Sequence, residues 1–360
     1  MTPLAARLVR RIAAEGPITV ADYMAACLLD PEHGYYATCE PFGVAGDFVT
    51  APEISQMFGE LIGLCLAQAW MAQGAPGRIV LAELGPGRGT LMADLLRAAA
   101  AVPGFAAAAR LHLVEASARL RALQARRLAE HAPVWHDSLD GLPEGPLFLV
   151  ANEFFDALPI RQFQRSGAAW AERMVGVRDG RLAFGLSPPA PLAGLADRLE
   201  DTAEGDLVET CPAAPGLAAE IGARIAAQGG AALIVDYGGW RSRGDTLQAL
   251  HAGAFDDPLA HPGEADLTAH VDFEPLAEAV RAAGAVPAGP TPQGVFLERL
   301  GIAQRTARLA DKLAGPALNA HMAGHRRLTH PEEMGRLFQV LGVSPPATPP
   351  LAGFDPGEGP

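Results

Sequence analysis

The stretch VLAELGPGRGT, residues 80–90, joins a hydrophobic run to a glycine-rich turn. Glu83 is followed by glycines at three alternate positions, Gly85, Gly87 and Gly89, and then by a helical pattern over residues 89–100. Glycine permits positive φ angles and lets the backbone approach a ligand closely, and a helix N-terminus favours an anionic group. The stretch therefore predicts a strand, a tight turn and a helix that together bind a small cofactor.

The spacing of the glycines distinguishes between cofactors. A dinucleotide fingerprint reads G-x-G-x-x-G, and its third glycine would fall at Thr90. A phosphate-binding P-loop needs a lysine before Ser or Thr, and this turn has none. The pattern acid-x-Gly-x-Gly-x-Gly instead resembles the first motif of class I S-adenosylmethionine-dependent methyltransferases. The resemblance implies that S-adenosylmethionine is the cofactor and that Glu83, Gly85, Gly87 and Gly89 bind it.

The sequence on both sides of this turn alternates short hydrophobic runs with helical stretches. The runs lie at 78–84, 109–116, 132–137, 145–152 and 231–239, and the helical stretches at 89–100, 117–131, 215–228 and 273–283. Such alternation predicts parallel strands that are buried on both faces, in a doubly wound, Rossmann-like α/β sheet. The pattern continues through TPQGVFLERL, residues 291–300.

Two additions to the sheet are expected in the first half of the chain. Residues 1–75 are predicted to be mainly helical, and Leu4, Leu8 and Ile12 have the spacing of a first amphipathic helix. Turn signals divide residues 161–186 into short runs, which predicts an inserted antiparallel β meander.

The expected domain organisation follows from these regions. A methyltransferase core spans residues 76–300 and carries the insertion 157–212. C-terminal helices follow over 301–342. Residues 343–360 are rich in proline and glycine and are expected to form a flexible tail, because they bury too little apolar surface to offset the entropy of ordering.

Composition limits the partners. The 360 residues are 49% hydrophobic, which indicates a globular protein, and the net charge of −13 makes nucleic acid a poor partner and a basic or neutral protein a better one.

Four scattered cysteines without C-x-x-C spacing indicate a reducing compartment and no zinc or disulfide framework. No apolar run approaches the ~18–20 residues that span a bilayer, so membrane insertion is not expected. The pair His321 and His325 lacks further ligands in register, and no metal is expected.

Two acids follow the next two predicted strands. Glu115 ends the run at 109–116, and Asp137 follows the run at 132–137. In class I methyltransferases these places hold the residues that bond the ribose hydroxyls and the adenine amine, so the resemblance assigns both residues to the cofactor. From the residues alone, Glu115 is also consistent with a charge that stabilises a helix N-terminus.

The fourth predicted strand ends in NEFFD, residues 152–156, at the edge of the sheet where ligands bind. For an arginine acceptor, Glu153 and Asp156 would hold the guanidinium and accept its proton, while Phe154 or Phe155 would supply a cation–π face. We assign Asn152 to the residues that bind the cofactor. Glu153 is the first candidate for the catalytic acid.

Other interpretations of this segment stay open. Asn152 and Phe155 have the spacing of an N-x-x-aromatic motif that would bind an amide or exocyclic amine. Phe154 and Phe155 are also consistent with ordinary core residues, and Asp156 with a turn residue.

A second candidate surface is GDFVTAPEIS, residues 46–55. Asp47 offers a further catalytic acid and Phe48 a substrate-binding ring, in a loop that would cover the cofactor. The same stretch is consistent with a helix that starts near Pro52 and includes Glu53.

Several long segments together resemble the MidA/NDUFAF7 family. They are residues 34–63, 83–98, 113–117, 152–163 and 262–273. The resemblance implies a protein arginine methyltransferase that symmetrically dimethylates the 49 kDa-type subunit of respiratory complex I during its assembly. It also implies the cytoplasm in a bacterium or the mitochondrial matrix in a eukaryote. A non-catalytic assembly chaperone and an amide or small-molecule N-methyltransferase remain alternatives, and the oligomeric state is open.

Overall fold

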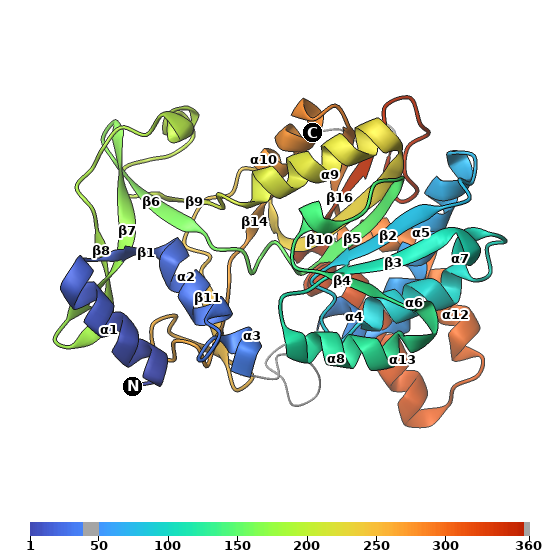
Figure 1. Cartoon of the computed structure of the whole chain (residues 1–360), viewed down its shortest axis with the longest axis horizontal. Helices are drawn as coiled ribbons and strands as arrows, with labels where there is room; N and C mark the ends of the chain where they lie inside the picture. Colours follow the sequence, from blue (N-terminus) through green and yellow to red (C-terminus); the bar gives the residue numbers. More distant parts are fainter. Residues whose placement is uncertain (39–49, 356–360) are drawn as a thin grey trace. The chain divides into compact units, whose positions relative to one another are not determined.

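The computed structural model describes residues 1–38 and 50–355. Within these residues the chain forms two compact units, each built from three separate segments (Figure 1). We call the unit with the described segments 50–155, 215–240 and 273–355 the sheet unit, and the unit with the described segments 1–38, 156–214 and 241–272 the insertion unit. Residues 1–75, expected to form one region, are therefore divided between the two units.

The sheet unit is built on a mixed sheet with the strand order β15-β16-β10-β5-β2-β3-β4. The strands are β2 (Ile79–Leu84), β3 (Ala109–Val114), β4 (Val134–His136), β5 (Leu147–Asn152), β10 (Gly230–Gly239), β15 (Val286–Pro292) and β16 (Phe338–Ser344). Neighbours from β10 to β4 run parallel, and β16 is antiparallel to both β10 and β15. Every residue of β2 and β5 is buried, as predicted for strands covered on both faces. The doubly wound α/β sheet is confirmed.

Helices cover both faces of this sheet. They are α4 (Ala51–Ile54), α5 (Gln56–Ala72), α6 (Thr90–Ala99), α7 (Phe105–Ala108), α8 (Ala118–Arg127), α9 (Ala214–Gln228), α10 (Phe273–Ala282), α11 (Gln293–Arg299), α12 (Ile302–Ala310), α13 (Gly315–Thr329) and α14 (Met334–Leu337). Alternate strand residues such as Leu81, Leu113 and Val150 pack with α5, α6 and α11 in one apolar cluster. In Figure 1, α9 and α10 lie together on the other side of the sheet from α6 and α13.

Helices α5 and α6 pack unusually closely, because α5 presents glycines at the contact. A Cβ atom on Gly63 would lie 2.7 Å from the carbonyl oxygen of Leu95 and 2.9 Å from its Cα. One turn earlier, Gly59 faces Leu91 and Asp94 in the same way. The buried Glu60 between them accepts hydrogen bonds from Arg97 and Arg305, which ties α5 to α6 and α12.

The insertion unit holds a second sheet with the order β1-β7-β6-β9 and β8 paired to β7. Its elements are α1 (Pro3–Glu15), β1 (Ile18–Thr19), α2 (Val20–Leu29), α3 (Tyr35–Thr38), β6 (Arg161–Ser166), β7 (Ala169–Arg178), β8 (Arg181–Leu186) and β9 (Leu207–Thr210). The predicted meander over 161–186 is confirmed as β6, β7 and β8, all antiparallel. The predicted first helix is confirmed as α1, whose Leu4, Leu8 and Ile12 are buried.

A small three-stranded sheet with the order β12-β11-β13 completes the insertion unit. Its strands are β11 (Gln248–His251), β12 (Ala254–Asp256) and β13 (Asp266–Thr268), and both pairings are antiparallel. Ala249 and Leu267 from this sheet join Met24 and Leu28 of α2 in a common apolar cluster. This sheet was not predicted, because its strands are only three or four residues long.

Two C-terminal expectations were wrong as far as residue 355, and the rest of the expected tail, residues 356–360, lies outside the described residues. The segment 338–344 forms the strand β16 inside the sheet, where Val340 and Val343 are fully buried. The segment 345–355 is not a free tail, since Leu351 and Phe354 are 5% and 7% exposed and pack on the apolar cluster of the sheet unit. Proline and glycine in this stretch shape a turn that returns apolar side chains to the core. Residues 291–300 also differ from a simple strand, because β15 ends at Pro292 and α11 follows.

Candidate active site

The glycine turn follows β2, as predicted, and all three of its glycines have left-handed backbone angles. The φ values are 59° at Gly85, 51° at Gly87 and 75° at Gly89. Gly89 is the N-cap residue of α6. The ring of Phe154 lies against Gly85, where an added Cβ would be 2.9 Å from the ring. The turn at the carboxyl edge of the sheet therefore depends on backbone angles that glycine adopts at little cost.

Glu83 is a buried acid at the end of β2, and it pairs in register with Leu113 of β3 and Val150 of β5. The side chain is 3% exposed, and its Oε2 atom has no hydrogen-bond partner among the described residues. Burial raises the pKa of this carboxyl to about 8, and the nearby charge of Glu115 adds to the shift. An uncompensated buried acid is costly, which makes it a candidate for a ligand-binding group.

Glu115 follows β3, and Gln124 of α8 holds its carboxylate. The Oε1 atom accepts a hydrogen bond from the backbone N–H of Ser117 at 2.8 Å, and Oε2 accepts one from Gln124 Nε2 at 3.1 Å. The same Nε2 donates to the carbonyl oxygen of Gly87 at 2.8 Å, and Trp135 Nε1 donates to Gln124 Oε1 at 2.8 Å. Gln124 was not predicted as a site residue, because a lone Gln in a helix gives no signal of its own.

Asp137 has a different environment from Glu83 and Glu115. Its side chain is 91% exposed, and Oδ1 lies 2.5 Å from Arg121 Nη2. Arg121 also donates to the backbone carbonyl oxygens of Glu115 and His136, so it joins the ends of β3 and β4.

Asn152 and Glu153 lie at the end of β5, and a hydrogen bond to one carboxylate oxygen of Glu153 links their side chains. Glu153 Oε1 accepts hydrogen bonds from Asn152 Nδ2 and from the backbone N–H of Ala51, both at 3.0 Å. No described residue donates to Glu153 Oε2, and Asn152 Oδ1 is buried without a partner among the same residues. Burial raises the pKa of the Glu153 carboxyl against the effect of these two hydrogen bonds. The backbone of Glu153 has a φ of +50°, a strained value for a residue with a side chain.

The two phenylalanines after Glu153 are held by Asp236 of the neighbouring strand β10, the residue after the register partner of Asn152. Asp236 Oδ2 accepts from the backbone N–H groups of Phe154 at 3.2 Å and Phe155 at 2.9 Å. The two rings pack edge to face at 5.4 Å between centroids. Phe155 is 2% exposed and belongs to the core, whereas Phe154 is only partly buried. Asp236, which is fully buried, was not predicted as part of this region.

The remaining predicted acids are distributed differently. Asp156 is buried, belongs to the insertion unit, and accepts a hydrogen bond from Ala269 through its backbone carbonyl. Asp47 and Phe48 lie outside the described residues. The carboxylate of Glu53 in α4 accepts from Thr90 at the start of α6, and it lies within 4.0 Å of Arg88 and Arg127. The predicted helix start near Pro52 is confirmed as α4.

Comparison with known proteins identifies the family. A family model described as an S-adenosyl-L-methionine-dependent methyltransferase matches residues 61–291. The mitochondrial protein arginine methyltransferase NDUFAF7 of Mus musculus is 38% identical, over 96% of this chain and 85% of its own length. NDUFAF7 of Homo sapiens is 37% identical, over 96% of this chain and 84% of its own length. The chain belongs to this methyltransferase family.

A solved member of the methyltransferase family has the same fold throughout. It is a protein from Burkholderia thailandensis that was crystallised with S-adenosylhomocysteine, and it is 33% identical with a TM-score of 0.85. The similarity covers 99% of this chain and 95% of the other. The cofactor of the family, S-adenosylmethionine, carries an electrophilic methyl group on a positively charged sulfur.

The residues at the carboxyl edge of the sheet fit such a cofactor. The three glycines of the turn carry no side chains of their own, and Glu83 Oε2 and Asn152 Oδ1 are buried acceptors without a protein partner in the described chain. Glu115 offers a carboxylate that is already oriented by Ser117 and Gln124. These acceptors match the ammonium and hydroxyl donors that the cofactor carries.

Proposed function

We propose that this methyltransferase transfers the methyl group to an arginine guanidinium of a protein. The observation that carries the proposal is Glu153, whose carboxylate is fixed through one oxygen and accepts no hydrogen bond from a described residue at the other. Its φ of +50° orients the side chain at the end of β5, a strain that the fold maintains at this position. The names of the curated relatives as protein arginine methyltransferases support the same acceptor.

The proposed reaction assigns a role to each side chain at the sheet edge. Glu83, the glycine turn, Glu115 and Asn152 hold the cofactor, and Asp137 contributes from the end of β4. Glu153 Oε2 accepts the proton that the guanidinium nitrogen loses as that nitrogen gains the methyl group, while the electron pair of the broken carbon–sulfur bond stays on sulfur. The raised pKa of Glu153 makes its carboxylate a stronger base than an exposed one.

Phe154 is the ring that we propose to face the substrate. It is only partly buried and contacts Gly85 of the cofactor turn, whereas the Phe155 ring is enclosed in the core. A cation–π contact from Phe154 would add about 0.5–2 kcal/mol to guanidinium binding. The amide or exocyclic-amine interpretation requires the Phe155 ring to stack on the substrate, and its burial speaks against that geometry. Asp156, Asp47 and Phe48 remain predicted contributors to the substrate side.

The substitution Glu153→Gln tests the role of Glu153. Glutamine keeps an oxygen that accepts from Ala51 N–H, but it cannot take up a proton, so turnover should fall at least about a hundredfold, as for the loss of a general base. Calorimetry should show unchanged affinity for S-adenosylhomocysteine. Glu209→Gln is the matched control, because Glu209 is also a buried carboxyl with a raised pKa but lies in β9. Normal turnover of Glu153→Gln would assign the base to another residue.

The proposed substrate is the 49 kDa-type subunit of respiratory complex I, on the basis of the family resemblance. Incubation of that subunit with the enzyme and labelled cofactor, followed by peptide mass spectrometry, should locate two methyl groups on one arginine. Label on lysine, on an amide nitrogen or only on small molecules would refute the arginine proposal. Cofactor binding without any methyl transfer to the subunit would favour an assembly chaperone.

The proposed location follows from the kind of organism. The curated relatives are named as mitochondrial proteins, and a eukaryotic source would place this chain in the mitochondrial matrix. A bacterial source would place it in the cytoplasm. No helix in the described residues is long and apolar enough to cross a membrane.

A further inference from the structure

A cluster of two histidines and one aspartate lies in the insertion unit, on the β11–β12 hairpin and the turn that follows it. His251 is the last residue of β11, Asp256 is the last residue of β12, and His261 comes five residues later. Ala252 and Gly253, with φ values of 52° and 75°, form the two-residue turn of the hairpin. The fold thus brings together three side chains that follow one another at intervals of five positions in the sequence.

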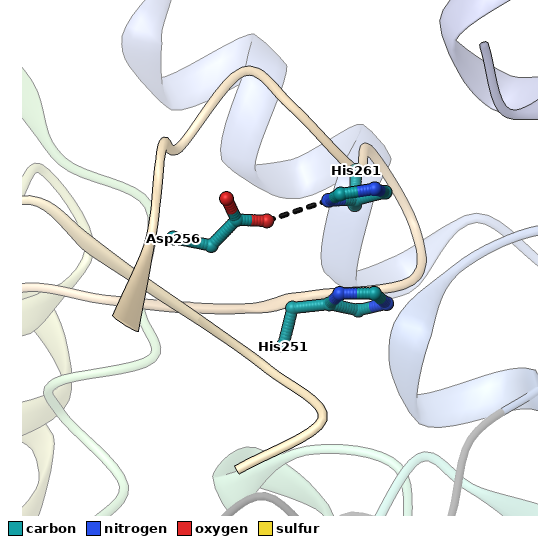
Figure 2. Close-up of side chains that lie close together, drawn as sticks. All are labelled: His251, Asp256 and His261. Atoms are coloured by element: carbon teal, nitrogen blue, oxygen red, sulfur yellow. Dashed lines mark hydrogen bonds and ion pairs between the residues drawn. The ribbon is translucent and has the colours of Figure 1, made fainter. Parts of the chain in front are cut away.

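The three side chains present their ligand atoms to one another. One such atom from each residue lies within 4.8 Å of the other two. The imidazole rings of His251 and His261 stack at 4.1 Å between centroids with an interplanar angle of 13°. Figure 2 shows the two rings one above the other, with the Asp256 carboxylate directed toward His261 Nδ1 at 2.5 Å.

The surrounding backbone holds this arrangement in place. The Asp256 Oδ1 atom accepts from the N–H of Asp257 at 2.8 Å, so Oδ2 is the oxygen that faces His261. The carbonyl oxygen of His261 accepts from Glu264 and Ala265, at 3.0 and 3.1 Å. Pro258 lies between Asp256 and His261 in the chain, and its carbonyl oxygen accepts a hydrogen bond from the hydroxyl of Tyr23 in α2 at 2.6 Å. The ligand set is therefore built on a fixed turn.

A hydrogen bond between Asp256 and His261 does not account for the whole cluster. His251 stacks face to face on His261, and no described residue forms a hydrogen bond with its ring. Two imidazoles next to a carboxylate are, however, a common ligand set for zinc and related divalent metals. With metal–ligand bonds of about 2.0–2.2 Å, ligand atoms lie ~3.4 Å apart in a tetrahedral site. The two stacked imidazole rings would therefore tilt apart so that one nitrogen of each ring points toward the ion.

We propose that His251, Asp256 and His261 bind one divalent transition-metal ion of the zinc class, with water completing its coordination. The ion would link the β11–β12 hairpin to the turn after it and displace the proton shared by Asp256 and His261. The proposal departs from the sequence-based expectation of no metal, which considered the helical pair His321 and His325. It is independent of the methyl-transfer proposal.

Calorimetric titration of the full chain with zinc chloride tests the site, after removal of any affinity tag and treatment with a chelator. One equivalent should bind, and the melting temperature should rise with zinc concentration, because a ligand that binds only the folded state stabilises it. His251→Ala, His261→Ala and Asp256→Asn should each weaken binding at least about tenfold, the lower end of what loss of a supporting residue costs a metal site. Circular dichroism of each metal-free variant checks that it folds.

The histidine pair on α13 provides the matched control. His321→Ala combined with His325→Ala should leave the stoichiometry and affinity for zinc unchanged. If this double variant abolishes binding, or if zinc binding survives in all three cluster variants, the proposed site is wrong. A wild-type chain that binds no zinc also overturns it.

Discussion

Glu83 is an acid whose environment differs strongly from water. Its carboxyl is enclosed at the end of β2 with one oxygen unpartnered in the described chain, and burial raises its pKa to about 8 from an ordinary value of 4.5. In the cofactor-free protein the group is therefore mainly protonated at neutral pH. The folded state binds this proton more tightly than the unfolded state does, so the contribution of Glu83 to stability is complete below pH 4.5 and is lost as the pH rises through about 8.

Glu83→Gln should reveal this pH dependence, because glutamine stays neutral. Without cofactor, the variant should become more stable relative to wild type as the pH rises from 5 to 9. The difference in the free energy of unfolding should grow by at most about 5 kcal/mol, because each unit of pKa shift corresponds to about 1.36 kcal/mol. Urea unfolding at several pH values measures the difference. A difference that does not change with pH would mean that the pKa of Glu83 is ordinary. Glu115→Gln should shift the transition of Glu83 to lower pH, since the charge of Glu115 helps to raise its pKa.

Gly87→Val should abolish cofactor binding without unfolding the protein. The φ of 51° at Gly87 disfavours any side chain, and a branched one would also occupy the backbone surface of the turn. Calorimetry with S-adenosylhomocysteine checks the loss. Gly180→Val is the control, since Gly180 has a φ of 75° in the β7–β8 turn with no neighbouring atom near its Cβ position. Both variants should lose about 1–2 kcal/mol of stability, and only the first should lose the ligand.

At the scale of elements, two side chains tie the segments that follow neighbouring strands to other elements of the sheet unit. Gln124 connects α8 to the glycine turn and to Glu115, and Asp236 of β10 holds the backbone after β5. Parallel strands place their carboxyl ends at one edge, and these two side chains fix the loops that leave that edge. The cofactor surface is therefore a property of several elements together.

The contact between α5 and α6 gives a prediction about packing. Gly63→Ala should destabilise the protein by about 1–3 kcal/mol, because the new methyl group would meet the backbone of Leu95 and force the helices apart. Gly216→Ala in α9 should instead stabilise by roughly 0.5–1 kcal/mol, since its Cβ position is open and alanine favours a helix. Urea midpoints compare the two variants. Equal effects of the two substitutions would show that close helix packing is not important at Gly63.

At the scale of the molecule, segments distant in sequence complete each unit. The sheet unit takes its central strands from residues 79–152, β10 from 230–239 and β16 from 338–344, and the last described turn closes over β16. The Phe354 ring packs on Gly342 and lies 5.2 Å from the ring of Phe296. The C-terminal segment is thus part of the core.

Phe354→Ala should lower the free energy of unfolding by about 3 kcal/mol, through lost burial and a cavity over β16. Thermal and urea unfolding measure the effect. Leu337→Ala is the control, because Leu337 is 46% exposed and should change stability by less than about 0.5 kcal/mol. If both variants behave alike, the terminal segment does not pack as described.

Local pattern determined the wound sheet, the glycine turn and the cofactor class. The strand runs were continuous and apolar, and Gly85, Gly87 and Gly89 have a spacing that excludes the dinucleotide and P-loop motifs. The acids at strand ends were also predictable, because parallel strands bring their carboxyl ends together. These features depend on residues that are close in sequence.

The tertiary structure alone decided the rest. The strand β16 enters the sheet because β10 and β15 provide a position between them, and its own sequence FQVLGVS does not show which neighbours it will have. Gln124, Asp236 and the cluster of His251, Asp256 and His261 gain their roles from neighbours that the fold supplies. A single polar residue is ambiguous in a sequence, because its partners, its burial and its pKa are set by contacts that form only when distant segments pack.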